Sequence, residues 1–285
     1  TSRDGVHWEK PDLGVVDIGG RRDHNIIYVS DLVQSSPTKR TYGPERFVTP
    51  TVAMTPQGKK AFFWGVNKHP HPRDEMEKYV ALAVVQDHRR GAHIVTSPDG
   101  IHWSCASSPF WQTPHDVCSK GDDCLMHLIY DDSRNKWVIY RRIIPDFSER
   151  MIANDSDRER PGTDRYNRSY ARAESTDLKD WTDHRHILAM DPDDPADTEL
   201  YQFGCHKIGE TFVGYMSIYY LQRPQPIDIH LATSRDGINF TRVSRGTPFI
   251  PAGPLNYYDY MAMACSQPKP IIVNDKLGNF PGDRI

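Results

Sequence analysis

Short runs of alternating apolar and polar residues recur along the chain and predict β-strands. Such alternation turns one face of a strand toward a core and the other toward solvent. Gly, Pro, Asn and Asp separate the runs, as turns require, and no long amphipathic pattern indicates a helix. The predicted strand segments are 59–66, 79–85, 124–131, 136–143, 203–220 and 260–273, with two further runs that end before Asp99 and Asp236. The pattern predicts an all-β fold.

One polar turn followed by an aromatic residue occurs several times. It reads TSRDGVHW at the start of the chain, TSPDGIHW from Thr96 and TSRDGINF from Thr233, and a fourth copy, STDLKDW, has Leu178 in place of Gly. Asp-Gly between strand-forming runs is a strong signal for a hairpin turn. We expect the aromatic residue to begin the returning strand with its ring on the packed face; it is Trp8, Trp103 or Phe240 in the three close copies.

The spacing of these turns predicts a radial arrangement of small sheets. The serines of the four copies are residues 2, 97, 175 and 234, so the separations are 97 − 2 = 95, 175 − 97 = 78 and 234 − 175 = 59 residues. Each interval accommodates one four-stranded blade with variable loops. We therefore expect a single domain over 1–285, a five-bladed β-propeller whose fifth blade starts in 257–273. We expect it to be a fragment, with the first blade lacking its opening strands and the last blade truncated.

Composition narrows the class of protein. The 285 residues carry 35 basic and 38 acidic side chains, a formal net charge of −3, spread along the whole chain. This balance favours neither a nucleic acid nor an anionic membrane as partner. No apolar run is long enough to predict a membrane span, and the sequence leaves the localisation and the oligomeric state open.

The five cysteines do not indicate a metal or redox motif. Their number is odd and no two stand in CxxC spacing, which disfavours structural zinc and thioredoxin-like chemistry. We expect buried free thiols; a small disulfide loop between Cys118 and Cys124 is the alternative.

Taken in order, the repeated turns and the segments between them resemble a known superfamily. The segments are GDDCLMHLIYDDSRNKWVIYRR, STDLKDW, ELYQFGCHKIGETFVGYMSIYY and ATSRDGINFTRVSRGTPFIPAG. Over residues 1–273 they resemble bacterial proteins assigned to the five-bladed β-propeller glycosidases, which include glycoside hydrolase families 32, 43, 62, 68, 117 and 130. The likeness is specific for the fold and less so for the reaction, because one fold hosts many chemistries.

The resemblance implies a set of acidic residues on the innermost strands of successive blades. By position in the repeat, Glu199 takes the part of the general acid, and Asp122 that of the carboxylate that holds substrate and tunes its neighbour. Asp259 is the third acid at the start of a strand run. No motif identifies the base or nucleophile, for which Asp23 is the nearest candidate.

Breaking a glycosidic bond requires a protonated carboxylic acid and an ionised carboxylate, which motivates this choice. The aromatic side chains of Tyr201 and Phe203, close to Glu199 in the sequence, would favour its protonated form. Only one of Asp122 and Asp123 can face a funnel, because adjacent strand residues point to opposite sides. The alternatives are solvated carboxylates in a turn at Asp122 and in an acidic loop at Glu199.

Several other residues are candidate substrate contacts. They are Asp23, His127, Arg141, His206 and Tyr258. The histidines follow the candidate acids on the same strand runs, although a lone strand histidine is usually structural. An arginine-rich stretch over 144–170 is a surface loop or, if inserted between the second and third strands of a blade, a site for an anionic glycan. No metal-ligand pattern is visible; the resemblance alone implies an axial calcium ion in some relatives.

We therefore expect a glycoside hydrolase-like enzyme whose partner is a carbohydrate. A propeller that binds glycan without cleaving it and a glycoside phosphorylase are the alternatives. The sugar, its linkage and the stereochemical outcome do not follow from the sequence.

Overall fold

The chain is all-β over the part that the structure describes. This computed structural model describes residues 7–15, 17, 19–25, 61–85, 91–105, 111–112, 126–143, 168–182, 185–221, 225–254, 256–257, 259–260, 273–274 and 283–284. Within these ranges, the helical structure is a single 3₁₀ turn, η1 (Glu75–Glu77). No helix in the described ranges is long and apolar enough to cross a membrane.

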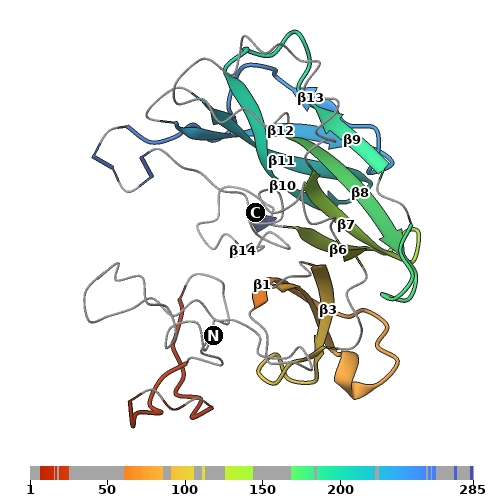
Figure 1. Cartoon of the computed structure of the whole chain (residues 1–285), viewed down its shortest axis with the longest axis vertical. Coiled ribbons are helices and arrows are strands. Elements are labelled where there is room, and N and C mark those ends of the chain that lie inside the picture. The colour runs from red at the N-terminus through yellow and green to blue at the C-terminus, as the bar shows by residue number, and fades with distance from the viewer. Residues whose placement is uncertain are drawn as a thin grey trace.

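In the described part of the chain, three antiparallel sheets each contain a run of four strands in chain order (Figure 1). The first contains β1 (Ala61–Lys68), β2 (Tyr79–Val85), β3 (Gly91–Ser97) and β4 (Ser104–Cys105), and β5 (Trp111–Gln112) also pairs with β3. The second contains β6 (His127–Asp131), β7 (Lys136–Ile143), β8 (Ser169–Ser175) and β9 (Arg185–Ala189). The third contains β10 (Thr198–Ile208), β11 (Thr211–Tyr220), β12 (Ile227–Ser234) and β13 (Thr241–Val243). A separate two-stranded pair joins β14 (Val273–Asn274) and β15 (Asp283–Arg284).

Most predicted strands are confirmed. The segments 79–85 and 136–143 are β2 and β7 with the predicted bounds, and 203–220 divides into β10 and β11 at the turn where Gly209 has a φ of +57°. The predicted run 260–273 lies outside the described residues except at its two ends.

The repeated turn is the connection from the third to the fourth strand of each sheet, and we call it the corner turn. In the first sheet, Ser97 Oγ accepts hydrogen bonds from the backbone N–H groups of Asp99 and Gly100, at 3.3 and 2.8 Å. Asp99 Oδ1 accepts from the N–H groups of Ile101 and His102, both at 2.8 Å. The second and third sheets repeat this pattern with Ser175 and Asp177, and with Ser234 and Asp236.

The residue after the aspartate adopts positive φ in all three described copies. The angle is +78° at Gly100, +66° at Leu178 and +70° at Gly237. Leu178 bears the strain of this conformation, but its side chain is buried in the cluster that includes Trp137 and Ile139. Packing therefore compensates for the missing glycine.

The expectation for the aromatic residue holds for Trp103 and Phe240 and is wrong for Trp8. Trp103 is buried, and Trp181 and Phe240 pack against buried clusters. Trp8 is 64% exposed.

Two hydrophobic clusters lie between neighbouring sheets. One joins Val80 and Ile94 of the first sheet to Trp137 and Ile139 of the second. The other joins Tyr140 and Tyr170 of the second sheet to third-sheet side chains, among them Phe203, Phe212, Met216 and Ile218. Burial of large apolar side chains on facing sheets is the main stabilising contribution here.

The first strands of the three sheets lie next to one another. Asn67 Nδ2 on β1 donates to the Leu128 carbonyl on β6 at 2.9 Å. The Cys205 N–H on β10 donates to His127 Nδ1 on β6 at 2.8 Å. The sheets therefore extend outward from a shared edge made of β1, β6 and β10 (Figure 1).

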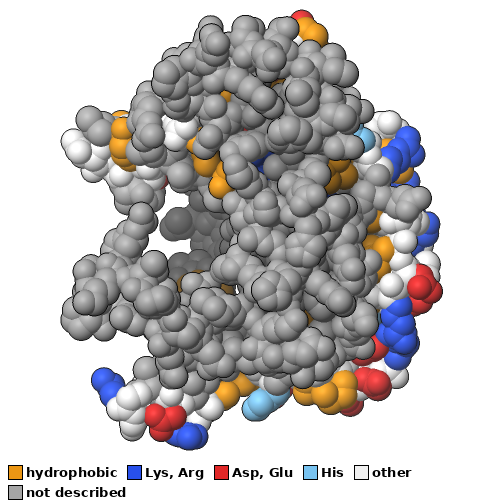
Figure 2. Space-filling view, in the orientation of Figure 1, with side chains coloured by type: hydrophobic (Ala, Val, Ile, Leu, Met, Phe, Trp, Pro, Cys, Tyr) orange, Lys and Arg blue, Asp and Glu red, His pale blue; other side chains and the backbone are white. Residues whose placement is uncertain are grey.

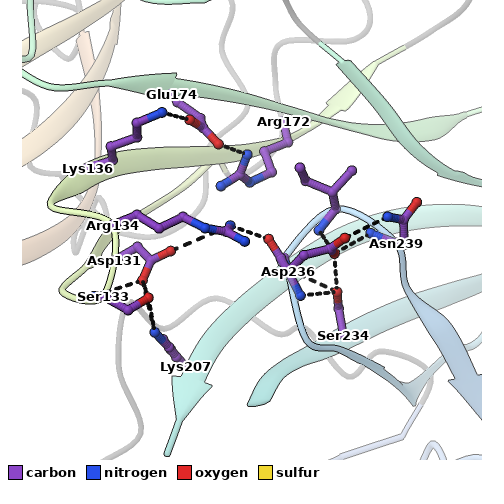
Figure 3. A network of polar contacts seen from close by, with 12 residues as sticks. Asp131, Ser133, Arg134, Lys136, Arg172, Glu174, Lys207, Ser234, Asp236 and Asn239 are labelled. Atoms are coloured by element: carbon purple, nitrogen blue, oxygen red, sulfur yellow. Dashed lines mark hydrogen bonds and ion pairs between the residues drawn. The ribbon is translucent and has the colours of Figure 1, made fainter. Parts of the chain in front are cut away.

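Polar contacts tie the second and third sheets together near the corner turn of the third sheet (Figure 3). Arg134 Nη1 donates to the Asp236 carbonyl at 2.5 Å, and Lys207 Nζ contacts the buried carboxylate of Asp131 at 3.0 Å. Tyr140 Oη donates to the Gly237 carbonyl at 2.9 Å. The corner turn thus serves packing between sheets as well as the hairpin itself.

Charged side chains of both signs are interspersed on the described part of the face in Figure 2. This distribution agrees with the nearly balanced composition.

Candidate functional site

Glu199 is a buried carboxylate near the start of the innermost strand of the third sheet. It is the second residue of β10 and is only 1% exposed. One carboxylate oxygen contacts Nη1 of Arg168, which immediately precedes β8 of the second sheet and is itself buried. The alternative of a solvated loop charge at Glu199 is therefore wrong.

Two tyrosines and a second arginine complete this cluster. Glu199 is paired with Tyr219 across β10 and β11. The Tyr201 and Tyr219 ring centroids are 5.5 Å apart, and the Arg168 guanidinium carbon lies 5.7 and 5.6 Å from them. Arg142 on β7 lies 5.0 Å from the Tyr201 centroid. We call Glu199, Arg168, Arg142, Tyr201 and Tyr219 the Glu199 cluster.

Local strand geometry explains why these side chains meet. The register of β10 with β11 shifts between Leu200 and Phe203, which marks a bulge. A bulge re-aims side chains on an innermost strand and is common beside functional sites. On β7, Arg142 is paired with Tyr170 of β8; the sequence places Arg168 two residues before Tyr170. Alternation thus directs both arginines to the same face of the second sheet.

The cluster combines two opposing influences on the Glu199 carboxyl group. Complete burial favours the neutral acid, whereas an arginine contact favours the charged carboxylate. A residue that must both hold and release a proton needs access to both states. The tyrosine rings offer the flat apolar faces on which a sugar ring can stack.

The structure does not bring the predicted acids together within its described part. Asp122 and Tyr258 lie outside the described residues. Asp259 is partly buried in a loop, where its carbonyl accepts from Gly253 N–H at 2.9 Å and its carboxylate lies against the Gly253 backbone. Asp23 lies at the surface and is paired with Arg21 at 2.7 Å, and this ion pair lowers the pKa of Asp23 to about 2.

The two predicted histidines lie side by side between the second and third sheets. The ring centroids of His127 and His206 are 4.8 Å apart in an edge-to-face arrangement, and both side chains are buried. His127 also accepts the hydrogen bond from Cys205 described above. These contacts give His127 a structural role in joining β6 to β10. Cys205 is a buried free thiol, as expected.

Arg142, rather than the predicted Arg141, is the β7 arginine of the Glu199 cluster. Arg141 is buried on the opposite face of β7, and its Nε donates to the Arg142 carbonyl at 3.3 Å. The two arginines are adjacent and follow the same apolar run, so the sequence alone does not distinguish them.

Sequence reasoning missed Tyr219 and considered Arg168 only as one arginine of the arginine-rich stretch. Arg168 is the last arginine of the arginine-rich stretch, and that stretch does connect the second and third strands of its sheet, β7 and β8. A signal was present, since Arg168 directly precedes the alternating run SYARAES that forms β8.

The axial calcium ion implied by the resemblance finds no fitting donor set in the part of the chain that the structure describes. No three His, Cys, Asp or Glu side chains converge there to hold a metal ion.

Comparison with known proteins adds a likeness of fold. No family model and no curated protein match the chain. Among solved structures, it is similar to an N-acetylgalactosamine deacetylase from F. plautii in complex with blood group B trisaccharide. The identity is 15% and the TM-score 0.48, over 89% of this chain and 61% of that one. A thermostable family-43 glycoside hydrolase is 13% identical with a TM-score of 0.47, over 67% of this chain and 58% of that one.

A β-1,2-mannobiose phosphorylase from Listeria innocua is 16% identical with a TM-score of 0.40, over 64% of this chain and 49% of that one. The chain thus spans about three fifths of the length of the first two structures and half of the third. The chain is similar, in fold alone, to glycoside hydrolases and other carbohydrate-acting enzymes.

Proposed function

We propose that the protein is a glycoside hydrolase-like enzyme that cleaves a glycosidic bond at the Glu199 cluster. The observation that carries this proposal is a fully buried carboxyl group on an innermost strand, in contact with an arginine that itself lies over two tyrosine rings. Burying a carboxylate costs desolvation free energy unless a partner such as arginine offsets it, and buried ionisable groups of this kind cluster at functional sites. Catalytic proton transfer is the role that fits both its burial and its partner.

The proposal includes a five-bladed propeller as the scaffold. Three sheets whose first strands share one edge support a radial arrangement. We assign the further blades to the repeat at Ser2 and to the run 260–273. In such a scaffold, side chains at the starts of first strands face one funnel.

We assign the carboxylate that holds substrate and tunes Glu199 to Asp122. His127, at the start of β6, contacts Cys205 on β10. Asp122 precedes His127 by 127 − 122 = 5 residues, and Glu199 precedes Cys205 by 205 − 199 = 6 residues. Each acid therefore precedes its own member of the His127–Cys205 contact by a similar number of residues, which supports placing both acids at one level of the funnel.

In the proposed reaction, protonated Glu199 donates its proton to the glycosidic oxygen as the bond from that oxygen to the anomeric carbon breaks. A carboxylate on the other side of the sugar activates water or attacks the anomeric carbon. The negative charge that develops on Glu199 as it gives up its proton is stabilised by Arg168, whose guanidinium group is already in contact with that carboxyl group. The candidates for the other carboxylate, which acts as base or nucleophile, are Asp23 and Asp259.

Two other functions have an observation in their favour. Arg142, which lies over the Tyr201 ring, supplies a cation of the kind that a phosphorylase would need for phosphate. The Arg168–Glu199 contact would also suit a purely structural ion pair in a propeller that binds glycan without cleaving it.

A screen of the protein against neutral and acidic oligosaccharides, with and without phosphate, tests these functions. We expect release of reducing ends without phosphate, and loss of this activity in Glu199→Gln. Glu174→Gln is the matched control, because Glu174 is also paired with a buried arginine but lies outside the Glu199 cluster. Strict dependence on phosphate would identify a phosphorylase. Binding without turnover would identify the binding module.

A further inference from the structure

A pocket of about 300 Å³ lies on the third sheet, apart from the Glu199 cluster. The connection from β9 to β10 forms one side, with Met190 and Pro195, and strand β11 forms another, with Met216 and Ile218. Thr198 also lines the pocket, whereas the next residue, Glu199, contacts Arg168. Because successive strand residues point to opposite faces, the two sites lie on different faces of β10.

Two arginines tie the walls of this pocket together. Arg242 on β13 is paired with Asp194 and donates to the Ala189 carbonyl at 2.6 Å. Arg245 is paired with Asp191 at 2.5 Å. The lining contains two arginines and two aspartates, so its formal charges cancel. A neutral ligand suits such a pocket better than a charged one.

His230 supplies the polar feature of the pocket. It lines the pocket from β12, is 6% exposed, and its Nε2 has no hydrogen-bond partner. Burial lowers the pKa of His230, which leaves a neutral imidazole at neutral pH. A buried polar atom without a partner is costly, so a hydroxyl group that meets it gains a hydrogen bond.

We propose that this pocket binds the ring of a neutral sugar, with a C–H face against Met216 and Ile218 and one hydroxyl group bonded to His230. The volume is at the small end of ligand pockets and suits one sugar ring. The choice of a sugar, among neutral molecules with an apolar face and a hydroxyl group, rests on the proposed function.

Binding of methyl glycosides of neutral hexoses and pentoses to the full chain, followed by ligand-observed NMR, tests this site. Val243 is at the pocket and 39% exposed, so Val243→Phe adds bulk there without disturbing the core. We expect it to weaken binding by about tenfold or more by filling ligand volume. Thr241→Phe, on the same strand but outside the lining, should bind like the wild type. His230→Phe should weaken binding by about three- to tenfold, the contribution of one hydrogen bond.

Glu199→Gln separates this inference from the proposed function, because it should lose cleavage and retain methyl glycoside binding at the pocket. If no glycan is cleaved while Val243→Phe still weakens methyl glycoside binding, the inferred sugar pocket is supported and the proposed enzymatic function is not. The inference is overturned by absence of saturable binding to the wild type, by equal binding in Val243→Phe and Thr241→Phe, or by loss of binding in Glu199→Gln.

Discussion

Glu199 and Arg168 form an ion pair that is almost completely removed from solvent, with exposed side-chain fractions of 1% and 8%. Burying such a pair costs desolvation free energy on both sides, and the attraction offsets that cost only while both partners are present. A surface pair behaves differently, because water screens each charge. The structure contains such a surface pair in Arg245 and Asp191, with exposed fractions of 38% and 40%.

These two pairs predict different responses to loss of the arginine. Arg168→Met should lower the free energy of unfolding by about 3–5 kcal/mol, because it leaves a buried carboxylate without compensation. Arg245→Met should lower it by less than about 1 kcal/mol. The double variant Arg168→Met with Glu199→Gln should recover part of the loss, as a double-mutant cycle in urea unfolding would measure. Equal, small losses of unfolding free energy in Arg168→Met and Arg245→Met would contradict the burial of the Arg168–Glu199 pair.

At the scale of the element, the corner turn shows what local sequence can and cannot predict. Its internal hydrogen bonds follow from Ser, Asp and Gly within a few residues, so the hairpins at Asp99, Asp177 and Asp236 were predictable. The contact from Tyr140 to the Gly237 carbonyl joins residues 97 positions apart. Only the packing of whole sheets creates such a contact, and the same is true of Arg168 with Glu199.

The corner turns differ in what surrounds the positive-φ residue. A Cβ atom on Gly237 would lie 2.7 Å from Tyr140 Oη and 3.1 Å from the Phe212 ring, whereas one on Gly100 would meet Tyr79 only at 4.0 Å. Gly100→Ala should therefore cost only the backbone strain, about 1–2 kcal/mol. Gly237→Ala should cost a further 1–3 kcal/mol or so from overpacking. Thermal unfolding of both variants measures this difference, and a larger loss in Gly100→Ala would contradict the described packing.

For the whole molecule, the arrangement of three sheets around a shared edge depends on polar contacts as well as apolar burial. Burial raises the pKa of Asp131, but hydrogen bonds from Ser133 and Lys207 outweigh it and the pKa is lowered. Backbone N–H groups of Asp180 and Lys179 lower the pKa of Asp177. The pKa of Asp236 is likewise lowered, because N–H donors outweigh its burial. The repeat spacing predicted separate sheets, but it could not specify these long-range partners.

These lowered pKa values predict a loss of stability in acid. Each of these carboxyl groups binds its proton less readily in the folded state, so the unfolded chain takes up protons first as the pH falls. The urea midpoint should fall as the pH drops below about 5, through the ordinary range of aspartate and down toward the lower folded-state values. The urea midpoint of Asp236→Asn should fall less steeply with decreasing pH than that of the wild type. A midpoint that stays constant between about pH 5 and pH 3 would contradict this account of the corner turns.

The most direct test of the central claim compares two aryl glycosides of the same sugar, one with a poor and one with a good leaving group. If Glu199 donates the proton, Glu199→Gln should lower kcat/KM by about 10²–10⁴-fold for the poor leaving group. The loss should be at least roughly tenfold smaller for a dinitrophenol that departs without protonation. An unchanged kcat/KM for both substrates would contradict a catalytic role of Glu199, and an equal loss for both would contradict its role as the acid.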